Sequence, residues 1–288
     1  MRKTLVVIGV GLIGGSAAKS FRKAFAVGHI IGVGRSQENL GQALDSGLID
    51  EVSTDAETAV GSADWVLVAT PVGQIPAVFE AIARSLPDDA IILDAGSTKQ
   101  DVIAAGRKHL GKHFSRFVPG HPVAGAEISG CQGARAELFS GKPVILTPHE
   151  GLQDKALEEA KDFWQSCGAV VTLMDAQIHD RIFAAVSHLP HALSYALVDM
   201  LAGRPDSELL FSYAASGFRD FTRIAASSPE MWRDICLANR GELMQVLAEY
   251  RDRLNEMLTW LTEEDTASLL KMFSHARSAR NRWGQDRQ

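Results

Sequence analysis

Two short segments of the sequence hold the polar side chains best suited to proton transfer. The segment DAGSTK at 94–99 carries Ser97 and Lys99, and the segment GHPVAG at 120–125 carries His121. Each segment directly follows a short apolar run, and an open parallel sheet binds its ligands at the carboxyl ends of the strands. A histidine held there between glycine and proline is poorly placed for core packing and well placed to take a proton. We therefore predict that His121 is an exposed catalytic base, with Ser97 and Lys99 on a neighbouring strand end.

A second group of candidates lies in the C-terminal part of the chain. In SHLPH at 187–191, His188 and His191 are three residues apart, so a helix would place them on one face. Pro190 would kink that helix and free a backbone carbonyl. With the two histidines on one face, such a site can bind an anion. Trp232 follows a methionine, and such residues lie more often in a core or a subunit interface than in a ligand site. We expect Trp232 to lie at an interface.

The N-terminus carries a cofactor signal. Gly9, Gly11 and Gly14 form GxGxxG between an apolar run at 5–8 and a helical pattern at about 16–26. The first glycine allows a tight turn, the second lets the backbone approach a pyrophosphate, and the third lets the helix pack on the strand. Because the strand, turn and helix are all present, we predict that this motif, including Leu12 and Ile13, binds a dinucleotide.

The end of the second predicted strand indicates which dinucleotide is bound. NAD-binding folds of this kind place an acidic residue there, whereas an arginine accommodates the extra phosphate of NADP. Here the segment is Gly34-Arg35-Ser36, with two side chains that can donate hydrogen bonds to a phosphate. NADP is the expected cofactor, and NAD stays open as a second one. Three further residues complete the predicted cofactor site: Thr70, Pro71 and Lys99.

The wider pattern predicts an α/β fold at 1–175, with a doubly wound parallel sheet of the Rossmann type. Short apolar runs alternate there with helical segments, as expected for a parallel sheet covered by helices. The runs lie at 29–33, 65–69, 91–94, 117–119, 143–147 and 169–174, and the helical segments at 39–46, 75–86 and 152–166.

The remaining part, 176–288, is expected to form an all-helical domain. Helical periodicity without strand-like alternation covers 180–201, 208–226, 230–261 and 264–279. The polar tail at 277–288 is expected to fray. Because the helix at 243–261 carries more apolar surface than one small domain must bury, we predict a homodimer joined through this domain.

Composition excludes several classes of protein. The formal net charge of −6 and the pI near 5.9 give no global basic field for a nucleic acid. No run approaches the roughly 20 apolar residues of a membrane span, and the run at 5–8 is too short for a signal peptide. Cys131, Cys167 and Cys236 form no CxxC pair, which favours a reducing compartment. We expect a cytoplasmic protein without a nucleic-acid or membrane partner, and the absence of metal-ligand spacing predicts no metal.

Together the motifs resemble the prephenate/arogenate (cyclohexadienyl) dehydrogenase family of tyrosine biosynthesis. The resemblance rests on GLIGGS, DAGSTK, GHPVAG and SHLPH, and on the long run SGFRDFTRIAASSPEMWRDI at 216–235. It covers nearly the whole chain. The last three motifs lie outside any generic dinucleotide fold and are therefore the more specific ones.

The resemblance implies a role for each matching residue. His121 polarises the ring hydroxyl of the substrate, and Ser97 helps to align substrate and nicotinamide. Arg223 holds a substrate carboxylate, and His191 is a second substrate contact. His179 matches a family histidine of unassigned role. The resemblance also implies supporting substrate positions at His188, Asp220 and Trp232.

The implied reaction is oxidative decarboxylation of prephenate to 4-hydroxyphenylpyruvate, or of arogenate to tyrosine, with hydride transfer to NAD(P). Prephenate carries two carboxylates, and a bidentate arginine such as Arg223 recognises a carboxylate directionally. No metal is required, because aromatisation drives the loss of carbon dioxide. No residue in the sequence decides between the two substrates. Since the two predicted domains account for the sequence, no fused chorismate mutase or regulatory ACT domain is expected.

Two alternatives stay open at this point. A 3-hydroxyacid dehydrogenase or an imine reductase has the same plan of dinucleotide domain and helical domain. It would place a catalytic lysine on the first helix of the second domain, where the run 178–181 has none. A non-catalytic sensor that binds a nicotinamide cofactor would leave His121, Ser97 and Arg223 unexplained.

Overall fold

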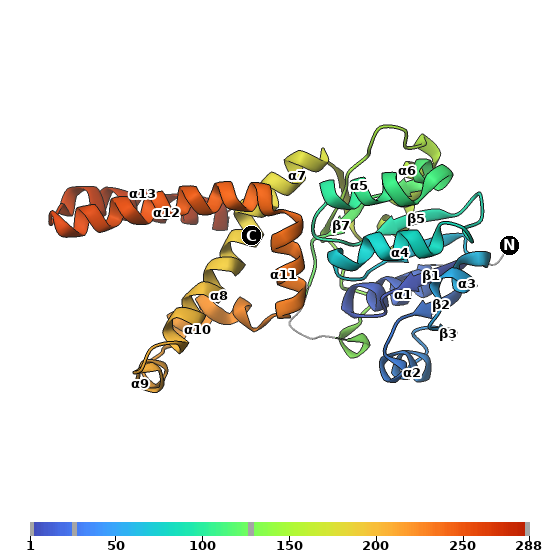
Figure 1. Ribbon diagram of the computed structural model, residues 1–288, viewed down its shortest axis with the longest axis horizontal. Coiled ribbons are helices and arrows are strands. Elements are labelled where there is room, and N and C mark those ends of the chain that lie inside the picture. The colour runs from blue at the N-terminus through green and yellow to red at the C-terminus, as the bar shows by residue number, and fades with distance from the viewer. Residues whose placement is uncertain (1–2, 25–27, 126–129, 286–288) are drawn as a thin grey trace. The chain divides into compact units, whose positions relative to one another are not determined.

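The computed structural model describes residues 3–24, 28–125 and 130–285. The chain forms two compact units, Met1–Arg240 and Gly241–Gln288. Strands and helices alternate in the chain as far as Leu173, and only helices follow in the described residues after it (Figure 1). The predicted fold class, a Rossmann-type sheet followed by an all-helical part, is therefore confirmed.

The central sheet has six parallel strands in the order β3-β2-β1-β4-β5-β6. Runs of Val, Ile and Leu suit strands that are covered on both faces. This order puts the crevice of a doubly wound sheet at the carboxyl end of β1, between β1 and β4. The strands are β1 Thr4–Ile8, β2 His29–Val33, β3 Glu51–Ser53, β4 Trp65–Val68, β5 Ile91–Asp94 and β6 Phe117–Val118.

Each face of the sheet is buried against its own set of helices. Side chains of β1 alternate between the faces, with Leu5 and Val7 packing beside Phe21 on one face, and Val6 beside Phe79 on the other. The first face is covered by α1 Leu12–Ala24, α2 Gln37–Asp45 and α6 Asp154–Ser166, and the second by α3 Ala56–Ala59, α4 Ile75–Ile82 and α5 Gln100–His109. The helix α1 begins inside the glycine motif, earlier than the predicted residue 16.

A second, three-stranded sheet was not predicted. Its strands β7 Gly120–Pro122, β8 Pro143–Leu146 and β9 Val170–Leu173 lie in the order β7-β8-β9, with β7 antiparallel to β8. The expectation that all later strands join one parallel sheet is therefore wrong. Pro119 separates β6 from β7 and has no N–H to continue the parallel ladder. Its carbonyl oxygen instead accepts from Thr147 N, beyond β8.

The helical part of the first unit begins with a long interrupted rod. Helix α7 Ala176–Phe183 passes into a π-helical turn, Ala184–His188, and then into α8 Leu189–Ala202. Pro190 cannot donate a backbone hydrogen bond, which accounts for a widened turn just before it. The shorter helices that follow are α9 Ser207–Ser212, α10 Ser216–Thr222 and α11 Pro229–Ala238.

The second unit consists of α12 Arg240–Thr262 and α13 Thr266–Gln285. Two expectations are corrected here. The helix predicted at 230–261 is broken at Asn239, and the helix predicted to end at 279 continues as far as Gln285. Residues 286–288 of the tail that was expected to fray lie outside the described residues. No helix in the described part of the chain is both long enough and apolar enough to cross a membrane.

Candidate active site

The glycine motif lines a pocket at the carboxyl end of β1. The pocket has a volume of about 490 Å³. Its lining includes six residues of the predicted cofactor site: Gly9, Gly11, Arg35, Ser36, Thr70 and Pro71. The side chains of Leu12 and Ile13 pack against the hydrophobic core instead, so only their backbone could contribute to a phosphate site.

The three glycines of the motif are needed for different reasons. Gly9 has a φ of +99°, and a Cβ there would lie 2.6 Å from the carbonyl oxygen of Ala69. A Cβ on Gly14 would collide with the carbonyl oxygen of Gly9, so the close packing of α1 on the turn requires glycine. A Cβ on Gly11 would meet no atom within 4 Å. That open approach is what the pyrophosphate of a dinucleotide needs.

The pocket carries a positive side chain after strand β2. Among the described residues, Arg35 is the only charged residue that lines the pocket, and no carboxylate does. Ser36 caps α2, with its Oγ accepting from Asn39 N at 3.2 Å. Asn39 in turn donates through Nδ2 to the carbonyl oxygen of Val10 at 2.7 Å, which ties α2 to the glycine turn.

Lys99 does not line this pocket, and its assignment to the cofactor site stays a prediction. Its side chain is fully buried in an ion pair with Asp94. The Lys99 ammonium also donates to the carbonyl oxygen of Gly120 at 2.7 Å, and Asp94 accepts from Gly120 N at 2.9 Å. The buried pair therefore fixes both backbone groups of the residue that precedes His121. No local sequence pattern indicates that the side chain of Lys99 turns inwards.

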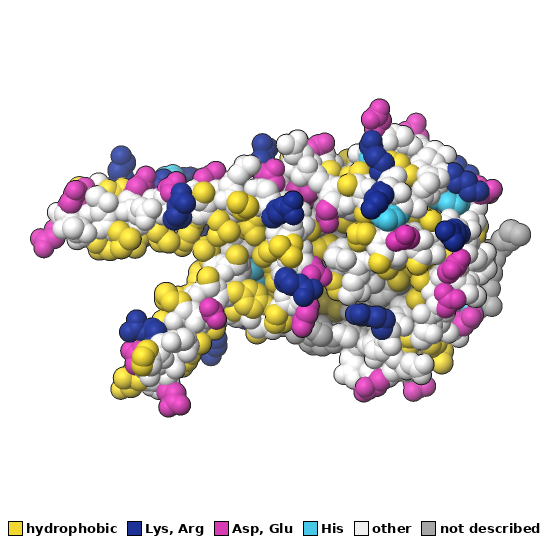
Figure 2. Space-filling view, viewed as in Figure 1, with side chains coloured by type: hydrophobic (Ala, Val, Ile, Leu, Met, Phe, Trp, Pro, Cys, Tyr) yellow, Lys and Arg dark blue, Asp and Glu magenta, His cyan; other side chains and the backbone are white. Residues whose placement is uncertain are grey.

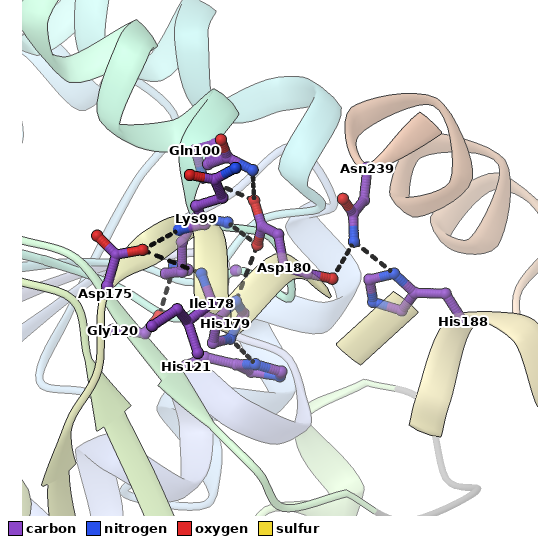
Figure 3. Close-up of polar contacts among 12 residues, drawn as sticks. Lys99, Gln100, Gly120, His121, Asp175, Ile178, His179, Asp180, His188 and Asn239 are labelled. Carbon is purple, nitrogen blue, oxygen red and sulfur yellow. Dashed lines mark hydrogen bonds and ion pairs between the residues drawn. The ribbon is translucent and has the colours of Figure 1, made fainter. Parts of the chain in front are cut away.

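His121 lies on strand β7 and is buried, contrary to the exposed loop position that was predicted. Its ring packs 4.6 Å from the ring of Phe183, measured between centroids. Its Nδ1 lies 2.8 Å from Nε2 of His179, and Nδ1 of His179 lies 2.8 Å from Oδ1 of Asp180 (Figure 3). The two histidines and the aspartate thus form one hydrogen-bonded chain.

The direction of donation in this chain follows from Asp180. A carboxylate can only accept, so the His179 proton lies on Nδ1 and its Nε2 accepts from Nδ1–H of His121. His121 is left with the lone pair of its Nε2. Burial, followed by the neighbouring His179 and Lys99, holds the pKa of His121 well below its usual value. The ring is therefore neutral near pH 7 and can accept a proton through Nε2.

Asp180 is held by the N-terminal end of α5. Its carboxylate accepts from the backbone N–H groups of Lys99 and Gln100, both at 2.9 Å. Burial alone would raise the pKa of Asp180, but the hydrogen bonds from His179 and these N–H groups outweigh it and lower the pKa. Asp180 was not predicted, although its place directly after His179 was the available signal.

The two histidines of SHLPH lie close to this chain. His188 is buried beside Asn239, and burial lowers its pKa to about 4. His191 stacks on Trp232, with ring centroids 3.6 Å apart. Trp232 is only 8% exposed and packs into the core between α11 and the sheet, so the expectation that it lies at an interface is wrong.

The other predicted site residues are more accessible. Ser97 is half-buried in the loop after β5, and Arg223 is exposed at the end of α10. Asp220 is also exposed, and its carboxylate lies 4.0 Å from Arg219. None of these placements tests a substrate role, which stays a prediction.

Comparison with known proteins decides the family. Residues 17–173 match the family model described as "Prephenate dehydrogenase, nucleotide-binding domain". Residues 175–275 match the model described as "Prephenate dehydrogenase, dimerization domain". The chain belongs to the prephenate dehydrogenase family. The resemblance seen in the motifs is confirmed, and the 3-hydroxyacid dehydrogenase and imine reductase alternatives are set aside.

Relatives of the family support this membership over the full length. The cyclohexadienyl dehydrogenase of Zymomonas mobilis is 38% identical, over 96% of this chain and 95% of that protein. The prephenate dehydrogenase of Bacillus subtilis is 35% identical, over 98% of this chain and 76% of that protein. The crystal structure of Aquifex aeolicus prephenate dehydrogenase with hydroxyphenyl propionate and NAD+ is 36% identical, covers 98% of each chain and has a TM-score of 0.90. This chain is accordingly a dehydrogenase that uses a nicotinamide dinucleotide.

Proposed function

We propose that the chain catalyses the NADP-dependent oxidative decarboxylation of prephenate, of arogenate, or of both. The observation that carries the proposal is the buried chain His121–His179–Asp180, which leaves the neutral His121 with one accepting nitrogen. Members of this family oxidise a carbon that bears a hydroxyl group, and a base of this kind suits that hydroxyl.

The proton follows the hydrogen-bonded chain. Nε2 of His121 accepts the hydroxyl proton, while the hydrogen on the same carbon leaves as a hydride. A bound nicotinamide supplies the hydride acceptor. As His121 becomes positive, its Nδ1–H bond to His179 strengthens, and the carboxylate of Asp180 stabilises the charge at the far end. The ring then loses its carboxylate as carbon dioxide, the bonding electrons make it aromatic, and the phenolate oxygen recovers its proton from His121.

Binding of the substrate carboxylates requires positively charged side chains or hydrogen-bond donors. Arg223 is proposed to hold one of them in a bidentate manner, and His191 to contact the substrate beside it. Ser97, in the loop between β5 and α5, is proposed to align substrate and nicotinamide. His188, Asp220 and Trp232 are proposed as supporting positions.

NADP is proposed over NAD because of the ribose end of the pocket. A carboxylate there would repel the extra phosphate of NADP, and none lines the pocket in the described part of the chain. Arg35 and Ser36 offer donors to that phosphate instead. Replacing Arg35 by alanine should therefore raise KM for NADP and leave KM for NAD nearly unchanged.

The proposed reaction is tested with four mixtures of purified protein, prephenate or arogenate each with NAD or NADP. Absorbance of the reduced cofactor is the readout. Activity in any mixture supports the reaction, and the ratios assign the substrate and the cofactor. A protein that binds NADP and oxidises neither substrate would contradict the proposal and favour the non-catalytic sensor.

We further propose that the chain is a homodimer through its helical part. Large apolar side chains stay exposed on α12 and α13, and Figure 2 shows such side chains along one edge of this unit. They include Met244, Leu254, Leu258, Leu261, Leu270 and Phe273. Light scattering at micromolar concentration should give twice the 31.1 kDa chain mass, and a monomeric mass would contradict the dimer.

A further inference from the structure

His188 keeps one ring nitrogen without a hydrogen-bond partner. The residue is 1% exposed, and its Nδ1 lies 3.1 Å from Nδ2 of Asn239. Its Nε2 is buried and has no partner within the described residues. What can bind at Nε2 therefore depends on which nitrogen carries the proton.

Asn239 determines the position of that proton. Its Nδ2 lies 2.8 Å from the backbone carbonyl oxygen of Asp180 (Figure 3). Because a carbonyl oxygen can only accept, the side-chain atom that faces it must be the amide nitrogen. The second hydrogen of the same NH2 group then points to Nδ1 of His188, which must accept it. His188 consequently carries its proton on Nε2.

The resulting N–H is a neutral, buried donor. Burial holds the pKa of His188 far enough below neutrality that the ring carries a single proton near pH 7. A buried donor without an acceptor loses its hydration without compensation, and native proteins rarely keep one unless a ligand or a water satisfies it.

The surroundings of His188 place this donor in the candidate active site. His188 is close enough to His121 to contribute to lowering the pKa of that residue. Its ring centroid lies 6.1 Å from that of Trp232, on which His191 stacks. The Nε1–H of Trp232 is likewise buried with no partner in the described part of the chain. Two unsatisfied donors therefore lie beside the residues proposed to bind substrate.

We propose that Asn239 is a positioning residue that holds His188 in its Nε2–H form, and that His188 donates this N–H to a carboxylate oxygen of the substrate. The inference rests on the proposed function, which supplies a substrate with two carboxylates. The hydroxyl of that substrate is the partner of His121. The acceptors left for His188 are the carboxylates and, in prephenate, the side-chain keto oxygen. Of these only the carboxylates are charged and shared by prephenate and arogenate, so they are the stronger acceptors.

Two replacements of His188 separate donation from packing. His188→Asn keeps an oxygen that can accept from Asn239 but removes the Nε2–H, whereas His188→Gln places an amide N–H near the original Nε2. With NADP and prephenate, His188→Asn should raise KM about tenfold or more, the effect of losing a hydrogen bond to a charged group. His188→Gln should recover much of this loss, and the Kd for NADP should stay within about twofold in both.

Tyr195→Phe is the matched control. It removes a hydrogen bond of 2.6 Å to the carbonyl oxygen of Ser227 in the same helical part and leaves the hydrogen bonds of His188 in place. It should lower stability slightly and leave KM unchanged. A KM that rises equally in this control would overturn the proposal, because the effect would then report packing alone.

Nitrogen NMR of protein labelled with ¹⁵N-histidine reads the tautomer directly. His188 in the wild type should show a protonated Nε2, and Asn239→Asp, which offers only acceptors, should move the proton to Nδ1. Addition of 4-hydroxyphenylpyruvate, which lacks the ring carboxylate, should shift the Nε2 signal if the side-chain carboxylate is the acceptor. A shift with prephenate alone would assign the ring carboxylate.

Failure of this inference and failure of the proposed function give different results. A wild-type protein that oxidises prephenate, combined with an unchanged KM in His188→Asn or a wild-type His188 protonated on Nδ1, overturns only the role of His188 and Asn239. A wild type that oxidises neither substrate contradicts the proposed function itself.

Discussion

His121 can take a proton only through Nε2, because its Nδ1 is occupied by His179. His121→Asn keeps a polar side chain but removes the accepting nitrogen of the ring. We expect kcat with prephenate to fall by about 10²–10⁴-fold, the usual contribution of a positioned base. The Kd for NADP, measured by fluorescence titration, should stay within about twofold. An unchanged kcat would exclude His121 as the base.

Lys99 contributes to stability because its partner is buried with it. Lys99→Met leaves the carboxylate of Asp94 buried without a counter-charge, and we expect the free energy of unfolding to fall by about 3–5 kcal/mol. Urea denaturation measures this change. The double replacement Asp94→Asn with Lys99→Met should cost less than the sum of the single ones, and strict additivity would contradict a direct interaction.

The site could be predicted only in part at this scale. Residue types with few structural uses, such as the histidine in GHP and the arginine after β2, could be chosen as candidates by their place in the chain. Lys99 and Asp94 were not, because a lysine beside a glycine-rich loop has the same sequence signature whether it faces a ligand or turns inwards. Asn239 was missed since its role depends on Asp180 and His188, which are distant in sequence.

At the scale of elements, the glycines in the turn between β1 and α1 are needed for different purposes, one for cofactor binding alone and another also for stability. A Cβ on Gly11 would meet no atom within 4 Å, so Gly11→Ala should leave the unfolding temperature nearly unchanged. The added methyl group would occupy the approach of the pyrophosphate, and the Kd for NADP should rise about tenfold or more. Gly9→Ala is the contrasting variant, because its φ of +99° and the nearby Ala69 carbonyl should lower the unfolding temperature as well. Equal stability losses in both would contradict this division.

Elements with regular periodicity were predicted well, and those defined by distant partners were not. The strand at 91–94 and the parallel order of the sheet follow from short buried apolar runs. Strand β7 has only three residues, Gly120–Pro122, and exists because β8 pairs with it across more than 20 residues of chain. No local sequence pattern predicts such a strand. His121 was therefore expected on an exposed loop and not on a strand.

At the scale of the whole molecule, the buried histidines make stability depend on pH. The pKa values of His121, His179, His188 and His191 are all lowered, in each case mainly by burial. As pH falls below 6.5, the usual pKa of histidine, the unfolded chain therefore binds more protons than the folded chain. Stability is complete above that pH and is lost on the way down towards about pH 4, where His188 titrates in the folded state.

His188 alone should account for a loss on the order of 3 kcal/mol over this range, since one pKa unit corresponds to about 1.4 kcal/mol. Asp101 acts in the opposite sense, because burial raises its pKa and its protonated form favours folding at acidic pH. Denaturant unfolding between pH 7 and pH 4 measures the sum. In His188→Gln the slope should be shallower, and an identical slope would show that His188 is not buried in a neutral form.

The π-helical turn at Ala184–His188 holds one residue more than a regular helix would need. Each residue of an α-helix advances the direction of the side chains around the helix axis by about 100°. Removing one residue therefore rotates every later side chain by about 100° relative to the earlier ones. Deleting a single alanine from this turn would therefore regularise the backbone and yet swing either Asp180 or His188 away from Asn239. The extra residue therefore sets the rotation of α8 about the helix axis relative to α7. Natural sequences that gain or lose one position in this turn should carry other residues in place of His188, Asn239 or both.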